Sequence, residues 1–582
     1  MNPEPRSCQS CQKQFVIEPG DFDFYRKINV PPPTWCPDCR MRRRLSFRNE
    51  RKVWMRPDAQ TGNQMFSGMP PRLTVPVYTA EFWRSDAWDP GEYARDYDFS
   101  RIFFEQFREL WYSVPWPGQS TLANINSEYC DQAGYCKNSY LCFNGDRLED
   151  SAYTLRCSYL NNCFDMIESF HNELCYECIM IDDCYQTFFS IDCEHCTNVW
   201  FSRDLTACSN CFGCTNLRNK QYCIWNEQYT KEEYAVKLAE LTGSWAARQA
   251  VEKKVKALWA QYPVKNLHGL QNYNSYGEHL HNTKNVRHSY SVQDAENVKY
   301  SQWMAIGPVK DSYDYSVWGH AASLIYESLT CGEQVNGLKF CFDCWPSCRD
   351  LEYSIFCRGS SNLFGCVGLK KKQFCIFNEQ YSEEDYWKLR ERIVAQMDQM
   401  KYTDKLGRTY GYGEFFPPEL SPFAYNETVL QDLFPLTEEQ AGVAGYIWGE
   451  TDPKEYIITM PAADLPDKIA DTSDDVLKQI IGCLDCKRAY RIIRPELDFL
   501  RRMNISVPRY CLECRTQQRM AKLNLPQYRE QSCMCGLPDK AYTNTIKHFH
   551  DSELCPNVFQ TSYPEDSSDI IYCEQCYNAE VV

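Results

Sequence analysis

The 582-residue sequence lacks the features of several common protein classes. It has no run of about 18 apolar residues, so we expect no membrane-spanning helix. Its first residues, MNPEPRSCQSC, contain no apolar h-region, which argues against a secretory signal and favours a cytoplasmic protein. It also has no P-loop, no Rossmann glycine fingerprint and no nucleophile elbow. We therefore lean against an enzyme and name no catalytic residue.

Positive charge is in deficit, and the formal net charge is −16. A chain this acidic does not attract nucleic acid through its overall charge, because binding to phosphates requires local positive charge. Any contact with RNA or DNA must therefore be confined to patches.

Cysteine, by contrast, is abundant, with 34 residues. In a cytoplasmic protein thiols stay reduced or bind metal. Thirteen of the cysteines lie in three terminal clusters, and the other 21 lie in the middle of the chain in a different pattern. We therefore expect two different roles for them.

Two segments 475 positions apart carry the same metal-binding pattern, a pair of Cys-x-x-Cys knuckles, and they align without a gap. Four thiolates form the tetrahedral shell that zinc prefers and leave no open position for catalysis. Segments this short depend on the metal to fold. We predict a structural zinc ion in each, with iron as the alternative, since four thiolates also suit iron. The predicted ligands are Cys8, Cys11, Cys36 and Cys39 in the first copy, and Cys483, Cys486, Cys511 and Cys514 in the second.

The C-terminal tail offers a third set of ligands. Seven residues there have metal-ligating side chains, which is more than one tetrahedral shell requires. We predict zinc on Cys555, Cys573 and Cys576, with the fourth ligand left open between His550 and the cysteines of the Cys-x-Cys pair, and with a two-ion arrangement as the alternative. The whole set is Cys533, Cys535, His548, His550, Cys555, Cys573 and Cys576. With the two four-cysteine segments, this predicts about three structural zinc ions.

A segment after the first knuckle pair corresponds to part of the C-terminal tail but lacks its metal-ligating cysteines. There VPVYTAEFW aligns with DIIYCEQCY, so that Thr79 and Phe82 stand where Cys573 and Cys576 do. We predict no metal at this place, and packing around Trp83 in its stead.

The knuckle segments resemble the probable zinc-ribbon domain family, whose pattern is CxxC followed by CPxCRxxR. Further segments, among them FGCTNLRNKQYCIWNEQY and CPNVFQTSYPEDSSDIIYCEQCY, are similar to uncharacterised multi-zinc-ribbon, cysteine-rich proteins of candidate-phylum bacteria. The resemblance covers most of the chain. It implies zinc binding in treble-clef-like modules and no particular activity.

A cluster of basic residues follows Cys36 and could contact a nucleic-acid backbone. The alternative is that these side chains pair with acidic patches of this same chain. The second knuckle copy has a thinner run, so the basic character is not intrinsic to the pattern. The candidate contact residues are Arg40, Arg42, Arg43, Arg44, Arg48, Arg51 and Lys52.

The cysteine-rich middle is an internal repeat. From Cys157, uncharged residues recur every six positions and cysteine returns every 18, which predicts a β-solenoid with coils of about 18 residues. The region is then duplicated at an offset of 152, where Leu363 replaces Cys211. We interpret the cysteines as core filler, with a metal or iron–sulfur site on neighbouring rungs as the alternative. Capping-box patterns at Thr230 and Ser382 predict helices that cover the solenoid ends.

Histidine is scarce, and four of the nine lie close together at His268, His279, His281 and His288. His279 and His281 would share one face of a strand, where they could hold a metal. The alternative is that they are polar positions on a solenoid rung.

The sequence thus predicts a multi-domain α+β protein, with zinc-ribbon modules at both ends of a duplicated β-solenoid. Its expected function is a non-catalytic, zinc-binding scaffold or adaptor for protein partners, with no membrane. The alternatives are a nucleic-acid- or ribosome-associated protein and a metal or redox enzyme that uses the solenoid cysteines. The expected parts are the first ribbon (1–55), a metal-free ribbon and connector (56–115), two solenoid repeats (116–262 and 263–400), an extended connector (401–475), the second ribbon (476–526) and the C-terminal module (527–582).

Overall fold

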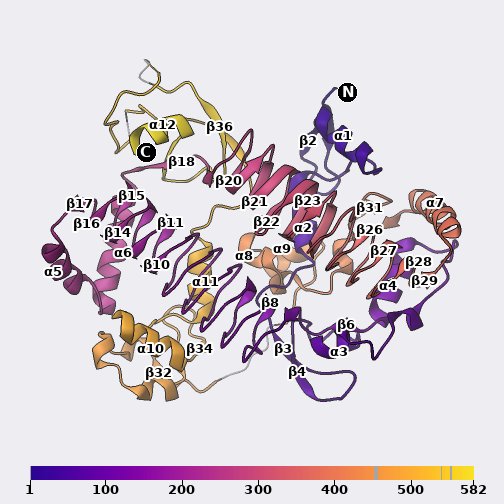
Figure 1. Ribbon diagram of the computed structural model, residues 1–582, viewed down its shortest axis with the longest axis horizontal. Helices are drawn as coiled ribbons and strands as arrows, with labels where there is room; N and C mark the ends of the chain where they lie inside the picture. The colour runs from indigo at the N-terminus through magenta and orange to yellow at the C-terminus, as the bar shows by residue number, and fades with distance from the viewer. Residues whose placement is uncertain (1, 451–455, 539, 551–553, 582) are drawn as a thin grey trace.

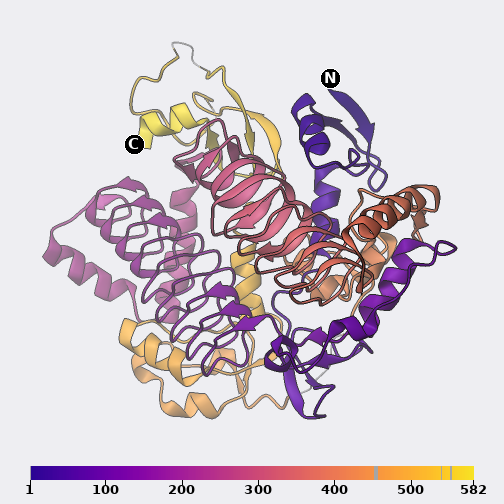
Figure 2. The same ribbon diagram turned by 45° about the vertical axis from the view of Figure 1, so that its right-hand side comes forward.

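Two stacks of short turns lie side by side and form the body of the protein in a computed structural model, which describes residues 2–450, 456–538, 540–550 and 554–581 (Figure 1). We name residues 121–228 the first stack and residues 269–380 the second stack. The two cysteine-knuckle segments and the C-terminal module pack around these stacks (Figure 2). The overall class is mixed α+β, as the sequence predicts.

The N-terminal part builds two small hairpin units before the first stack. The first unit, residues 4–45, ends in α2, and the second, residues 54–117, leads through α4 into the first stack. The elements are β1 (Glu4–Ser7), β2 (Gln14–Ile17), α1 (Pro19–Lys27), α2 (Pro37–Leu45), β3 (Trp54–Pro57), β4 (Gln64–Ser67), β5 (Val77–Tyr78), α3 (Ala80–Arg84), η1 (Pro90–Tyr93), α4 (Phe103–Ser113) and β6 (Trp116–Pro117).

Successive turns of the first stack pair in parallel, each position with the one twelve further along the chain, as in Phe143↔Leu155 and Leu155↔Ile167. The predicted coil length of 18 is therefore wrong. Residues with positive φ recur every third position, for example Asn162, Asp165 and Glu168, so each turn has four short sides. The strands are β7 (Thr121–Leu122), β8 (Asp131–Gly134), β9 (Phe143–Asp146), β10 (Tyr185–Phe188), β11 (Ile191–Glu194), β12 (Thr197–Trp200), β13 (Arg203–Thr206), β14 (Ser209–Phe212), β15 (Thr215–Arg218), β16 (Gln221–Ile224) and β17 (Glu227–Gln228).

The second stack has longer turns. Its pairings advance by twelve positions at Tyr290↔Gln302, by fourteen at Ala295↔Val309 and by thirteen at Tyr313↔Tyr326. Strand β18 (Pro263–Lys265) precedes this stack and pairs in parallel with β37 (Ile570–Tyr572). The strands of the second stack are β19 (Gly269–Leu270), β20 (Tyr276–Lys284), β21 (Arg287–Lys299), β22 (Gln302–Met304), β23 (Val309–Gly319), β24 (Ala322–Ser323), β25 (Tyr326–Gly332), β26 (Arg349–Glu352), β27 (Ser361–Phe364), β28 (Gln373–Ile376) and β29 (Glu379–Gln380).

A helix follows each stack where a capping box was predicted. The Thr230 hydroxyl accepts a hydrogen bond from the Glu233 N–H and begins α5 (Lys231–Leu241), which contacts β16 and is followed by α6 (Trp245–Trp259). The Ser382 hydroxyl does the same for the Asp385 N–H and begins α7 (Glu383–Gln399), which contacts β28. These helices cover strands that would otherwise present open edges.

The chain after α7 is more folded than the extended connector that we expected. Phe415, Phe416 and Leu430 are buried in the core that the N-terminal units share with the second stack. A short 3-10 helix, η6, leads to Cys483. The elements are β30 (Tyr402–Thr403), β31 (Thr409–Tyr410), η2 (Pro418–Leu420), η3 (Tyr425–Glu427), α8 (Val429–Leu433), α9 (Glu438–Val443), β32 (Met460–Pro461), η4 (Ala462–Asp464), η5 (Ile469–Asp471) and η6 (Asp474–Lys478).

The last part of the chain repeats the order of the N-terminal units. Its elements are β33 (Ile481–Gly482), β34 (Ala489–Tyr490), α10 (Arg494–Met503), α11 (Leu512–Met520), β35 (Arg529–Ser532), β36 (Val558–Thr561), β37 (Ile570–Tyr572) and α12 (Glu574–Val581). The placement is crossed: α2 contacts β23 and β25 of the second stack, whereas Phe499 of α10 packs on Phe164 and Tyr176 of the first stack (Figure 1).

Candidate metal centres and the arginine clamps

The first four-cysteine segment gathers its ligands at one point. The donor atoms of Cys8, Cys11, Cys36 and Cys39 all lie within 4.8 Å of one another. The sulfurs of Cys11 and Cys36 are 3.8 Å apart. In a tetrahedral shell with metal–sulfur bonds of about 2.3 Å, two sulfurs are separated by about 3.8 Å. The geometry therefore fits one tetrahedral ion.

The second four-cysteine segment has the same geometry. Its sulfurs are 3.8 Å apart at Cys483 and Cys514, and 3.6 Å apart at Cys486 and Cys511. The Cys511 N–H donates to the Cys483 sulfur at 3.3 Å, as the Cys36 N–H donates to the Cys8 sulfur at 3.2 Å. In each copy the third cysteine is also the N-cap of the helix that follows, α2 or α11. Each four-cysteine loop and the helix that it begins therefore form one structural unit.

Helix α2 carries two arginines into a buried acidic site of the second stack. Arg40 forms an ion pair with Asp314 at 2.8 Å, and Arg44 donates to the other oxygen of Asp314 at 3.1 Å. The two arginines are four positions apart and so share one face of the helix. All three side chains are at most 1% exposed.

Helix α11 repeats this arrangement on the first stack. Arg515 forms an ion pair with Asp165 at 2.5 Å, and Arg519 donates to the other oxygen of Asp165 at 2.6 Å. Asp165 is fully buried. We call each set of two arginines and one aspartate an arginine clamp. The first clamp is Arg40, Arg44 and Asp314, and the second is Arg515, Arg519 and Asp165.

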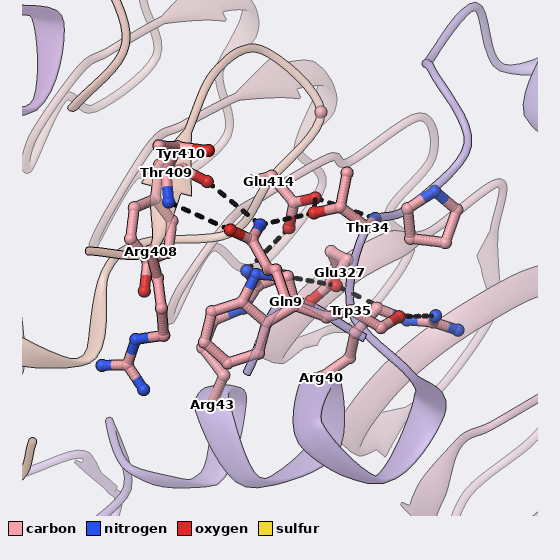
Figure 3. Close-up of polar contacts among 12 residues, drawn as sticks. Gln9, Thr34, Trp35, Arg40, Arg43, Glu327, Arg408, Thr409, Tyr410 and Glu414 are labelled. Atoms are coloured by element: carbon pink, nitrogen blue, oxygen red, sulfur yellow. Dashed lines mark hydrogen bonds and ion pairs between the residues drawn. The ribbon is translucent and has the colours of Figure 1, made fainter. Parts of the chain in front are cut away.

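Further carboxylates balance the charge around the first clamp (Figure 3). Arg43 donates to Glu327 at 2.8 Å and to Glu414 at 2.7 Å. Burial alone would lower the pKa of Arg43, but these two carboxylates outweigh it and raise the pKa. Glu414 also accepts from the backbone N–H of Thr34 at 3.1 Å. Glu414 belongs to the connector after α7. Its hydrogen bonds therefore join the connector to the first four-cysteine segment, which in turn contacts Glu327 of the second stack through Arg43.

The predicted nucleic-acid contact is not supported by the position of the basic run. Arg40, Arg43, Arg44 and Arg48 are at most 2% exposed. Arg51 pairs with Asp432 and Glu513, and Arg42 lies 4.1 Å from the ring centroid of Phe434. Lys52 is half-buried. Five of the seven candidate residues form ion pairs with carboxylates of the same chain, as buried guanidinium groups require.

All seven candidate ligands of the C-terminal module lie together, in two overlapping groups. One group is Cys533, Cys555, Cys573 and Cys576, and the other is Cys535, His548, His550 and Cys576. The spacing of the ligands in sequence does not rank His550 against the Cys-x-Cys pair as the fourth ligand. The structure places Cys533 with the three predicted cysteines.

The unit at residues 54–117 keeps the backbone of the C-terminal module without its thiols. The Thr79 hydroxyl accepts from the Phe82 N–H at 3.3 Å, where the Cys573 sulfur accepts from the Cys576 N–H at 3.5 Å. Trp83 is 1% exposed and donates from its indole to the Pro115 carbonyl at 2.9 Å. Side-chain hydrogen bonds and packing thus occupy the corresponding place.

The cysteines of the stacks lie in mixed columns. Ser139, Cys163 and Cys211 occupy the same position in their respective turns, and all three are buried. The Cys163 thiol donates to the Asn172 carbonyl at 3.4 Å, as the Ser139 hydroxyl donates to the Leu148 carbonyl at 3.1 Å. Burial raises the pKa of Cys178 to about 12, so its thiol remains a donor. These observations favour core filler.

The histidine run reaches a cavity of about 640 Å³ between the two stacks and α12. The Nδ1 atom of His268 lies 2.5 Å from Glu278, and its Nε2 atom lies 3.7 Å from Asp192 of the first stack. His279 stacks on His268 with ring centroids 5.2 Å apart, and the ligand atoms of Asp192, His268 and His279 are close enough to be a candidate cation group. His281 lines the same cavity, whereas His288 bonds to Tyr276. Through Asp192, His268 and His279 therefore connect the second half of the body to the first stack.

Comparison with known proteins adds little. No protein-family model and no curated protein matches the chain. Among solved structures, a Desulfovibrio desulfuricans G20 protein with a provisional acetyltransferase name aligns over 52% of this chain and 76% of its own, at 10% identity and a TM-score of 0.10. A likeness this weak carries no argument. Within the part of the chain that the structure describes, no helix has the length and apolar character needed to cross a bilayer.

Proposed function

We propose that this protein is a non-catalytic, zinc-dependent scaffold. In it, structural zinc ions fold zinc-ribbon modules, and the modules lock two β-solenoid segments together. The long outer faces of the solenoids would then serve as binding surfaces for protein partners. The observation that carries the proposal is the equivalence of the two arginine clamps, each of which joins a four-cysteine loop to a stack.

The chemistry of the clamps supports a structural role for the metal. Each clamp buries charged groups, and such groups are stable only while their partners are held in position. The loops that begin α2 and α11 are too short to fold without a metal. Zinc suits these loops because four thiolates form the tetrahedral shell that it prefers. With all four positions occupied by cysteine, no position is left for a substrate.

Nucleic-acid binding is the weaker alternative, because the basic run that suggested it is engaged inside the protein. A redox role for the stack cysteines is also weaker, since serine and aliphatic residues share their columns. Neither alternative explains why the arginines four positions apart occur in both copies.

Hydrogen exchange before and after removal of zinc with a chelator tests the proposal. We expect faster exchange in α2 and α11, and also in the strands that α2 contacts, β23 and β25. Unchanged protection in both helices after the metal has gone would show that zinc is not structural. Filter binding with single-stranded RNA and duplex DNA at physiological salt provides the second arm, and we expect no retention. Tight, salt-dependent retention would favour the nucleic-acid alternative instead.

A further inference from the structure

We infer that the C-terminal module holds two metal ions that share the thiolate of Cys576. This inference rests on the proposed function only in so far as the cysteine groups bind zinc. The starting observation is that the seven ligands divide into two groups of four with one member in common, Cys576.

The first shell consists of thiolates only. The sulfur of Cys555 lies 3.9 Å from that of Cys573 and 3.6 Å from that of Cys576. Both separations are close to the edge of about 3.8 Å expected for a tetrahedral zinc–thiolate shell. The Cys573 N–H donates to the Cys533 sulfur at 3.1 Å, which repeats the bond between the third and first cysteines of the other two loops. Cys533 is therefore the fourth ligand of this shell.

The second shell is mixed. The His550 Nε2 atom lies 3.5 Å from the Cys576 sulfur and 3.6 Å from the Cys535 sulfur. With zinc–sulfur and zinc–nitrogen bonds of about 2.3 and 2.1 Å, a tetrahedron places these atoms about 3.6 Å apart. The His548 Nδ1 atom completes the group at 3.0 Å from the Cys535 sulfur. Two imidazoles and two thiolates form a shell typical of structural zinc.

A buried carboxylate orients one of these imidazoles. The Nε2 atom of His548 lies 2.7 Å from Glu580, whose side chain is fully buried. A proton on Nε2 leaves Nδ1 with a free lone pair that faces Cys535. Carboxylates hold metal-bound histidines in this way, and Glu580 is also fixed by bonds from Tyr542 and Thr545.

Charge also favours a second ion. The module brings five cysteines to one buried place, and a thiolate in such a place needs a compensating cation. One divalent ion would neutralise two of the four thiolate charges in the first shell and none at Cys535. A second ion adds two positive charges next to Cys535 and Cys576. The amide of Asn544 donates to the Cys535 sulfur at 3.0 Å, which suits a thiolate at that position.

Metal content of the purified full chain is the first test. Inductively coupled plasma mass spectrometry should give four zinc ions, one for each of the two four-cysteine segments and two for the C-terminal module. His548→Phe should lower the content by one ion, whereas His195→Phe, at an exposed histidine outside the module, should not change it. Cys8→Ser and Cys483→Ser should each lower the content by one. If those two variants lost nothing, the proposed function would fail. If only they lost zinc while His548→Phe kept the native content, the shared-thiolate site would be wrong.

X-ray absorption at the zinc edge keeps the test independent of whether a variant folds. Two zinc ions that share one thiolate should lie about 3.5–3.9 Å apart, given bonds of about 2.3 Å. We expect this zinc–zinc scattering in the native protein and its loss in His548→Phe. Native spectra without that scattering would overturn the inference and leave Cys535 and His548 as a hydrogen-bonded thiol–imidazole pair.

Discussion

Arg519 and Asp165 are 354 positions apart in the sequence, yet the guanidinium of one donates to the carboxylate of the other at 2.6 Å, with both side chains buried. Arg44 and Asp314 have the same relationship in the other half of the protein, at 3.1 Å. The arginine clamps thus join segments that lie far apart in the sequence.

Removal of one arginine should be costly. Arg519→Met leaves the fully buried Asp165 with a single cationic partner, and breaking a buried ion pair typically costs about 3–5 kcal/mol. We expect urea unfolding to show a loss of this size. Arg502→Met, at an exposed arginine of α10, is the matched control and should change stability by less than about 0.5 kcal/mol. The double variant Arg519→Met with Asp165→Asn should recover part of the loss, and equal losses in the single and double variants would contradict the clamp.

Loss of one metal ligand should also affect the second stack. Cys36→Ser removes a thiolate and also changes the N-cap of α2, so the helix that carries Arg40 and Arg44 loses its anchor. We expect the loss of one zinc ion and faster hydrogen exchange in β23 and β25. Faster exchange confined to residues 4–45 would show that the loop and the second stack are not coupled.

A stack cysteine should behave differently. Cys211→Ala removes one buried sulfur and should cost roughly 1–2 kcal/mol with no change in metal content. Leu363→Ala, at the corresponding place in the second stack, removes more atoms and should cost about 2–5 kcal/mol. Thermal unfolding together with metal analysis checks both. Release of a metal ion from Cys211→Ala would show that the stack cysteines are ligands.

The contact of His268 with the carboxylates should depend on pH. Burial alone would lower the pKa of His268, but Asp192 and Glu278 outweigh it and raise the pKa to about 10, with Asp204 adding to the effect. Burial lowers the pKa of the neighbouring His279 to about 3, so that ring is neutral.

The sign follows from linkage. The unfolded-state pKa of His268 is about 6.5, so its stabilisation is complete below that pH and is lost as the pH rises toward 10. His268→Gln should therefore destabilise the protein strongly at about pH 7 and only weakly at about pH 10, with the difference on the order of a few kcal/mol. Urea unfolding of both proteins at the two pH values measures it. A difference that is the same at both pH values would mean that His268 is not charged.

The sequence made the metal loops predictable because their ligands are local. Two Cys-x-x-Cys pairs at a fixed separation predict a four-thiolate metal site, and the thiols of both copies lie close together as predicted. The arginines of the clamps could be identified from the sequence, because Arg40 and Arg44 align with Arg515 and Arg519. Their acidic partners could not be identified, because Asp165 and Asp314 are single acids in an acidic chain and lie far from the arginines in sequence.

The coil length was misjudged for a physical reason. Inward positions recur at every third place, and all of them accept small or apolar side chains, so a step of six or eighteen positions fits the cysteines as well as twelve does. The αL residues at the corners do not distinguish these steps either, because they too recur at every third position. The step of twelve is fixed by the pairing between turns, such as Phe143↔Leu155, which the sequence does not reveal.

The crossed placement of the clamps has a consequence for synthesis on the ribosome. Asp165 and the aromatic face around it are made early, but Arg519 emerges 354 positions later. Until then the first stack carries an unpaired acid on an uncovered apolar surface. A chain that stalls or is cut before its second four-cysteine segment would therefore leave the first half open to aggregation, and we expect nascent chains of this protein to need chaperones.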